Sequence, residues 1–179
     1  MTPAGPAPVP GARFRDSVSL LASAVTVVTT ATADGPAGMT ASAVCSLSLN
    51  PPQLLVCVQN ALPTHQALAG SRWFAVNVLG EEQAGIARRF ATPGIDRFHG
   101  LALREDSPAP VLRQALAYFV CAAGGRHPGG DHSIFTGLVV SCGHQPGQRP
   151  LLHFGRGFRS LADPQDQLLR AWAEAGMLA

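Results

Sequence analysis

Short stretches of alternating apolar and polar residues, the pattern of β-strands, run through most of the chain. Extended segments rich in valine, threonine and aromatic residues are predicted at 24–32, 38–49, 53–58, 73–79, 115–123, 133–142 and 151–154. The turn signal Asp34-Gly35-Pro36 joins the first two segments into a hairpin. Asn50-Pro51-Pro52 ends the second, because neither proline can donate to a strand ladder. The pattern indicates a mainly β protein, and we expect a barrel and not a parallel βαβ sheet.

Helical periodicity is confined to short segments. Phe14, Val18, Leu21 and Val25 repeat with helical spacing, and further short helices are predicted at 64–69, 81–91 and 165–175. The helix at 81–91 has acids at its start and Arg88-Arg89 at its end, which matches the helix dipole. Residues 1–12 carry four prolines and are predicted to be a disordered tail. We therefore expect one domain over 13–162, followed by a C-terminal helix within 163–179.

Composition excludes several reaction classes. The chain has 179 residues, and all 13 of its basic side chains are arginine. Without lysine it cannot form the Schiff base of a pyridoxal phosphate enzyme, nor can it supply the phosphate-binding lysine of a P-loop or a protein kinase. Any bound phosphate must therefore rest on arginine, hydroxyl groups or backbone N–H groups.

Charge and cysteine usage bear on partners and compartment. The net charge is +2 and the arginines are spread along the chain, which argues against a nucleic-acid surface. No apolar run approaches the roughly 20 residues of a membrane helix. A secretory signal at the N-terminus is the alternative to a helix and strand there, and Asp16 among the basic residues disfavours it. The four cysteines lie in predicted strands without a Cys-x-x-Cys pair, so we expect buried thiols and a cytoplasmic protein.

Three segments carry candidate chemistry. Small and hydroxyl residues from Gly38 to Ser48 would let a flat ligand approach the backbone, although a serine-rich strand at a barrel seam would have the same composition. The stretch from His127 to His132 is interpreted as a loop that caps a strand. It is a poor metal site, because side chains of adjacent residues diverge along an extended chain. Gly155-Arg156-Gly157 opens no helix, so it is not a Rossmann fingerprint.

In their order and spacing, five segments resemble the flavin reductase family that supplies reduced flavin to two-component monooxygenases. They are the runs 38–52, 54–58 and 74–79, then Arg89-Phe90-Ala91 and Gly130-Asp131-His132. The resemblance extends from about Phe14 to Leu161. It implies an FMN-binding split β-barrel of Greek-key-like topology, usually a homodimer, that binds FMN or FAD and uses NADH or NADPH.

The resemblance also implies roles for individual residues. Met39, Thr40, Ala41 and Ser42 would border the isoalloxazine, and the ribityl chain and phosphate would lie near Ser46, Val58, Gln59, Asn60, Thr64 and His65. Arg89 is a candidate partner for the phosphate, followed by Phe90. Gly155, Arg156, Gly157 and Phe158 would lie beside the nicotinamide pocket, with phenylalanine where the family often has tyrosine. His132 is the expected catalytic residue, which would orient the nicotinamide.

The expected function is a cytoplasmic NAD(P)H:flavin oxidoreductase whose reduced flavin serves a partner oxygenase. No metal is expected. A flavin-binding module without turnover is one alternative, and a split-barrel flavin oxidase acting on a small amine is another. The sequence leaves open NADH against NADPH, FMN against FAD, whether the flavin stays bound, and which oxygenase is served.

Overall fold

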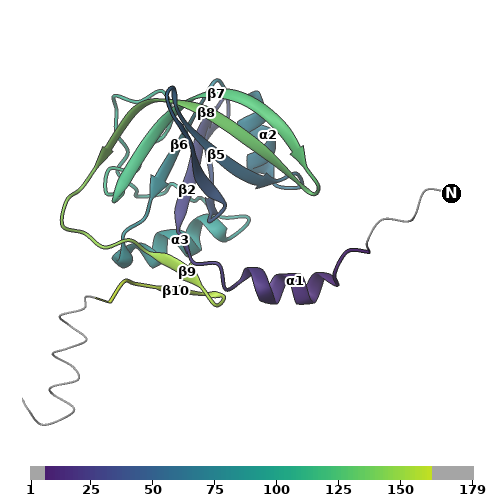
Figure 1. Cartoon of the computed structure of the whole chain (residues 1–179). Helices are drawn as coiled ribbons and strands as arrows, with labels where there is room; N and C mark the ends of the chain where they lie inside the picture. The colour runs from purple at the N-terminus through teal and green to yellow at the C-terminus, as the bar shows by residue number, and fades with distance from the viewer. Residues whose placement is uncertain (1–6, 163–179) are drawn as a thin grey trace, which may run out of the picture.

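A seven-stranded antiparallel sheet organises the chain in the computed structural model, which describes residues 7–162. Its strand order is β3-β2-β6-β7-β8-β5-β4 (Figure 1). The strands are β2 (Thr26–Thr32), β3 (Gly35–Ala41), β4 (Val44–Leu49), β5 (Pro52–Gln59), β6 (Trp73–Val78), β7 (Ala117–Gly129) and β8 (His132–His144). A small second sheet holds β1 (Ser23–Ala24), β9 (Leu152–Phe154) and β10 (Gly157–Arg159). The mainly β expectation is confirmed.

The two end strands of the large sheet are neighbours in the sequence. Only Ser42 and Ala43 separate β3 from β4, so the sheet must curl until its ends approach each other. The amide of Cys57 on β5 donates to the carbonyl of Ala43 at 2.9 Å. We call residues 42–43 and the adjoining ends of β3 and β4 the seam. The prediction of one strand over 38–49 is wrong, because the chain changes from one end of the sheet to the other at this point.

Three helices flank the barrel within residues 7–162. They are α1 (Gly11–Val18), α2 (Pro63–Gly70) and α3 (Ala84–Ala91), the last preceded by a 3-10 turn at Glu81–Gln83. Among the described residues of α1 none is buried, and the helix extends away from the barrel (Figure 1). It begins at Gly11, inside the predicted tail, and ends at Val18. Val25 lies in both the predicted helical repeat and the predicted extended segment 24–32. Its backbone bonds Leu151 and Leu79, which agrees with the extended prediction and places its side chain in the core.

Three apolar clusters of described residues hold the fold together, and two of them bear on the site. The barrel interior is formed by side chains of β2, β5, β6, β7 and β8 with Leu68 of α2. The second cluster packs Ala87 and Phe90 of α3 against Val27 of β2, together with Leu79 and Leu151. The latter cluster attaches α3 beside β3, which positions the residues of the site described below.

The hairpin of β7 and β8 is longer than predicted. β7 runs to Gly129 and β8 starts at His132, so the segment interpreted as a loop is mostly strand, with a two-residue turn at Gly130-Asp131. Gly130 has φ +73°, a conformation that glycine adopts without cost. The strand β10 was not predicted, because three residues carry too little periodicity.

The cysteines are less buried than expected. All four are unpaired and lie in strands, but only Cys121 is buried, while Cys45 and Cys142 are exposed. Burial raises the pKa of the Cys121 thiol to about 12, so it stays protonated. No helix within residues 7–162 is long and apolar enough to cross a membrane. The predicted C-terminal helix at 165–175 lies outside the described residues.

Candidate functional site

Gly38 allows α3 to approach the backbone of β3. A Cβ atom at this position would lie 2.9 Å from Cε1 of Phe90 and 3.0 Å from the carbonyl oxygen of Val28. Two residues further along, Oγ1 of Thr40 donates to the carbonyl of Ala87 on α3 at 2.6 Å. The middle of β3 is thus held against α3 by close packing and by a hydrogen bond.

The carbonyl of Gly38 accepts hydrogen bonds from two side chains of other elements. Nη1 of Arg97 donates to it at 2.6 Å, and Oγ1 of Thr64 at the start of α2 donates at 3.4 Å. Nε of Arg97 also donates to the carbonyl of Thr92, at 3.1 Å. Arg97 is not among the site residues predicted from the sequence. It lies in the irregular segment after α3, where no periodicity distinguishes it, and the neighbouring Asp96, which caps two backbone amides, is the only local signal.

A chain of polar groups connects α2 to the β7–β8 hairpin. Nε2 of His65 lies 3.0 Å from Oγ of Ser133, and that hydroxyl donates to Oδ1 of Asn60 at 2.8 Å. Because the single hydroxyl proton is directed to Asn60, His65 must be the donor in its own contact with Ser133. The backbone N–H of Asn60 donates to the carbonyl of Asp131, between β7 and β8, at 2.9 Å. The predicted residues Asn60 and His65 therefore support the hairpin that carries His132.

His132 and Asp131 meet at the tip of this hairpin. Nδ1 of His132 lies 2.7 Å from Oδ1 of Asp131. This hydrogen bond and the charge of the imidazole lower the pKa of the Asp131 carboxyl. The prediction that the two side chains diverge is wrong, since Asp131 lies in the turn and not in an extended strand. Within residues 7–162 no group of three or more His, Cys, Asp or Glu side chains could hold a metal ion.

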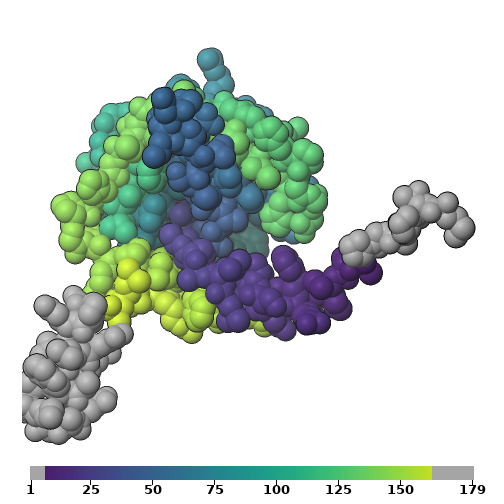
Figure 2. Space-filling model, in the orientation of Figure 1, coloured from purple at the N-terminus to yellow at the C-terminus, as the bar shows by residue number. Residues whose placement is uncertain are grey.

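The turn between β9 and β10 meets α1 beside the seam. Gly155 and Arg156 both have positive φ, and the amide of Gly155 donates to the carbonyl of Ser19 at 2.8 Å. The guanidinium of Arg156 pairs with Asp16 of α1. In Figure 2 the purple surface of α1 lies beside this yellow-green segment. A cavity of about 580 Å³ is lined by Ser42, Ala43 and Arg156 together with residues of α1. The fold thus brings Ser42 and Arg156 to one cavity from distant parts of the sequence.

The remaining predicted residues divide by exposure. Ala41, Val58 and Phe90 are buried in the core, and Met39 packs against it, so their side chains support the site from behind. Ser46 is exposed on β4 opposite Leu54, and no hydrogen bond within the described part of the chain joins its side chain to the other predicted residues. The other three lie at the surface or half-buried near the site, namely Gln59 at the end of β5 and Gly157 and Phe158 on β10.

Arginines provide the positive charge around these elements. Nη1 of Arg89 donates to the carbonyl of His99 at 2.8 Å, which leaves its other N–H groups for a ligand. The guanidinium of Arg88 lies 5.4 Å from the ring centre of Phe158. β3 is an end strand, so one of its edges offers backbone groups that no ladder uses. Backbone donors and acceptors, hydroxyls and arginines suit a flat heterocycle that carries a phosphate. These residues therefore fit a flavin.

Comparisons with known proteins identify the family of this chain. The model of the flavin reductase like domain family matches residues 18–162. The reductase component of a 4-nitrophenol 4-monooxygenase/4-nitrocatechol 2-monooxygenase from Rhodococcus opacus is 43% identical over 150 residues, covering 84% of this chain and 80% of the relative. An FMN reductase (NADH) from Methylorubrum extorquens is 41% identical over 157 residues, covering 86% and 78%.

A solved structure gives the same result. The NADH:FAD oxidoreductase from Streptomyces globisporus, determined in complex with NAD and FAD fragments, superposes with a TM-score of 0.81 at 37% identity and covers 87% of this chain and 94% of that one. The family match extends over most of the chain, and the split-barrel architecture agrees with it. The chain therefore belongs to the flavin reductase like domain family.

Proposed function

We propose that this chain is an NAD(P)H:flavin oxidoreductase that reduces FMN or FAD and supplies the reduced flavin to a partner monooxygenase. The observation that carries the proposal is the convergence on Gly38 of α3, the start of α2 and Arg97, in a chain of this family. The relatives from Rhodococcus and Methylorubrum, a monooxygenase reductase component and an NADH-dependent FMN reductase, support the same reaction.

The end strand β3 and the seam would hold the flavin ring through backbone groups and the hydroxyl of Ser42. Arg89 would pair with the phosphate, because no lysine is present to do so. When bound, the flavin accepts a hydride from the nicotinamide, and this redox chemistry belongs to the two cofactors. The task of the protein is therefore to bring two rings together in register and to exclude competing orientations.

His132 would orient the nicotinamide at the hairpin tip. Its Nδ1 is engaged by Asp131, so Nε2 is the atom left to contact a ligand. The network of Ser133, Asn60 and His65 supports the strand and the turn on either side of it. Arg156 and the β9–β10 turn, which contact α1, would border the nicotinamide pocket. These residues act by position, and no covalent intermediate with the protein is required.

The test is steady-state oxidation of NADH and NADPH by the purified chain with FMN, FAD or riboflavin. We expect repeated turnovers of NADH with at least one flavin. Absence of NADH oxidation with all three flavins, in a protein that is folded by circular dichroism, would contradict the proposal. Varying the flavin and the nicotinamide together then distinguishes a diffusible flavin from a resident one, because resident flavin gives parallel lines in double-reciprocal plots.

A homodimer is the assembly that we propose for this chain. Leu47 and Leu49 of β4 and Leu138 and Val140 of β8 are exposed large apolar side chains on the two strands that flank β5, and Leu49 is 90% exposed. Burying such side chains against a second copy would remove them from water. Sedimentation equilibrium should give twice the chain mass, and Leu138→Asp should lower it. A monomer at all concentrations would contradict this assembly.

The cytoplasm is the proposed compartment. Four unpaired cysteines, two of them exposed, are typical of a reducing environment. Fractionation of the source cells with an antibody against the chain tests this assignment, since recovery in a secreted fraction would contradict it.

A further inference from the structure

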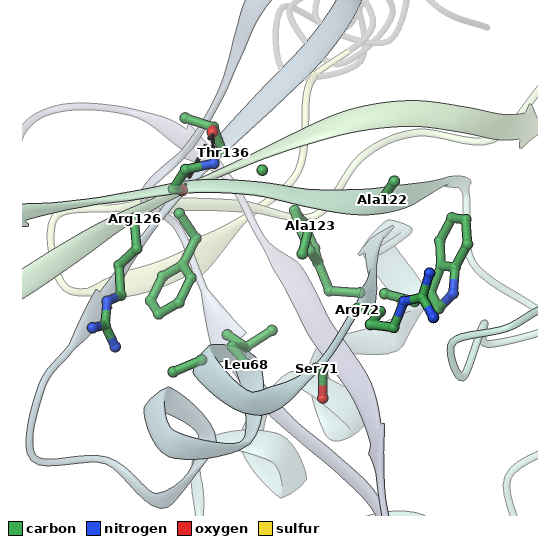
Figure 3. Close-up of a pocket in the computed structure, with 13 residues that line it drawn as sticks. Leu68, Ser71, Arg72, Ala122, Ala123, Arg126 and Thr136 are labelled. Carbon is green, nitrogen blue, oxygen red and sulfur yellow. Dashed lines mark hydrogen bonds between the residues drawn. The ribbon is translucent and has the colours of Figure 1, made fainter.

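A second cavity lies on the barrel away from the seam. It has a volume of about 530 Å³ and lies between the last turn of α2, the start of β6 and the middle of the β7–β8 hairpin (Figure 3). This volume is within the range of sites that hold small organic ligands. Among the predicted flavin-site residues none lines it.

A glycine bulge shapes the cavity. The pairing of β7 with β8 shifts register between Ala123 and Arg126, so Gly124 and Gly125 leave the regular ladder. A Cβ on Gly124 would lie 2.9 Å from Oγ1 of Thr136, and the amide of Gly125 donates to that oxygen at 2.9 Å. The bulge is therefore held in place by a specific contact, and it opens the space above the core.

The floor and walls of the cavity are apolar and aromatic. Leu68, Phe74 and Phe135 are buried beneath it, and Trp73 forms a half-buried wall. At the α2 end, Oγ of Ser71 donates to the carbonyl of Ala67 at 2.7 Å, which satisfies one of the last acceptors of the helix. A planar ring could stack in this space without leaving a buried polar group unpaired.

Two arginines flank the cavity at opposite ends. Figure 3 shows Arg72 and Arg126 on either side of Leu68. Neither guanidinium has an ion pair or a hydrogen bond with any residue from 7 to 162, whereas Arg104 pairs with Asp106 at 3.1 Å. The cavity lining contains no aspartate or glutamate. Its field is therefore positive, and its donors are available to an oxyanion.

We propose that this cavity is a second binding site, which takes a planar aromatic oxyanion, either an aryl carboxylate or an aryl phosphate. The ring lies over the floor of Leu68, Phe74 and Phe135, and the oxyanion pairs with Arg72 or Arg126. The site shares no residue with the seam and lies at the opposite end of α2 from Thr64, and its one contact with a predicted flavin-site residue is that of Phe135 with the ring of His65, edge to face at 5.3 Å. The two arginines therefore take no part in the flavin reaction.

Isothermal titration calorimetry with 1-naphthoate and 1-naphthyl phosphate tests the site. Both share one ring, so the tighter ligand identifies the preferred oxyanion, and the neutral 1-naphthalenemethanol is the control for ring burial alone. We expect one molecule per chain, and whichever of Arg72→Gln and Arg126→Gln removes the paired guanidinium should weaken binding by about tenfold, as should the double variant. Arg113→Gln, which removes an exposed arginine elsewhere on the surface, should leave the affinity unchanged.

A second variant probes the space itself. Ala123→Phe would place a ring in the cavity and should abolish binding while both arginines remain. Equal affinity of the wild type and the double arginine variant, or equal affinity for the neutral alcohol, would overturn the proposal. The double variant should oxidise NADH with FMN at the wild-type rate. A parallel loss of turnover would also overturn it, because the arginines would then belong to the reaction site.

Discussion

Two parts of the candidate site, the middle of β3 and the tip of the β7–β8 hairpin, are held with very different firmness. On the β3 side, Gly38 is buried, Phe90 is fully buried beneath it, and Thr40 is hydrogen bonded to α3. On the hairpin side, the side chains of His132 and Asp131 are 42% and 82% exposed and are joined mainly to each other. The β3 side is part of the core, whereas the hairpin tip stands at the surface.

Because of this difference, we expect the two parts of the site to have different functions. Residues that serve both core and site cannot change without loss of stability, because their contacts are buried. Residues at the exposed tip can change with little effect on folding. We therefore expect the β3 side to bind the flavin and the hairpin side to meet the exchanging nicotinamide, so that variants separate stability from turnover.

The largest effect should come from Phe90→Ala. Removing a fully buried ring under β3 should cost about 3–5 kcal/mol of unfolding free energy, measured by urea denaturation. Gly85→Ala on the same helix is the matched control. Nothing lies within 4 Å of its added Cβ, so it should stabilise the protein by roughly 0.5–1 kcal/mol. Truncating a buried phenylalanine in a core normally costs well over about 1 kcal/mol. A smaller loss of unfolding free energy for Phe90→Ala would show that the β3 side is no more firmly held than the hairpin tip.

His132→Ala should reduce turnover strongly and leave folding almost unchanged. Loss of a group that orients the nicotinamide should lower kcat by roughly 10²-fold, with FMN affinity within twofold of the wild type. His144→Ala, an exposed histidine at the other end of β8, is the control and should retain full activity. A negligible rate in both the wild type and His132→Ala would favour the flavin-binding module instead of the enzyme.

Arg89→Ala should discriminate between flavins. If its guanidinium meets the phosphate, FMN binding should weaken by about tenfold while riboflavin binding changes little. Comparison of the two dissociation constants cancels any general effect of losing the bond to His99. Equal weakening of both ligands would place Arg89 at the ring end of the flavin.

The smallest effect concerns the ionisation of Asp131. Its pKa is lowered from 3.8 by the bond to His132, so His132→Ala should raise it toward that value in a carboxyl NMR titration. A lowered folded-state pKa stabilises the protein above the unfolded pKa and stops doing so as the pH falls through the folded one. The wild type should therefore be slightly more stable than the variant at neutral pH, and the difference should vanish in acid. An unchanged titration would show that the pair does not form in solution.

Local signals predicted much of the fold. The β2–β3 hairpin follows from Asp34-Gly35-Pro36, and α2 and α3 follow from their periodicity. The break at Ser42-Ala43 was missed because a single serine without glycine, proline or asparagine beside it is a weak turn signal, and the break depends on how the whole sheet closes. The side chains of Asp131 and His132 were expected to diverge because Gly130-Asp131 was not recognised as a two-residue turn within the predicted loop.

The segments that contribute to the candidate site could be predicted from the sequence, but the arrangement of their residues in space could not. The resemblance named β3, the start of α2, the end of α3 and the hairpin, and their residues do come together around Gly38 and Ser133. Arg97 could not be found in this way, because its role is a contact with a carbonyl 59 positions earlier in the chain. Phe90 was named as a binding residue, and its complete burial shows a supporting role that local sequence does not reveal.

The two-residue seam makes flavin binding a reporter of global folding. The proposed flavin site would draw on α2, α3 and the β7–β8 hairpin as well as on the seam and the rest of β3, so a partly unfolded chain would have no such site. A ligand that binds only the native state stabilises it by mass action, by about 2.7 kcal/mol at a hundred times its dissociation constant. Thermal melting in rising FMN would then measure flavin affinity directly, even in a protein that releases its flavin too readily to be coloured when purified.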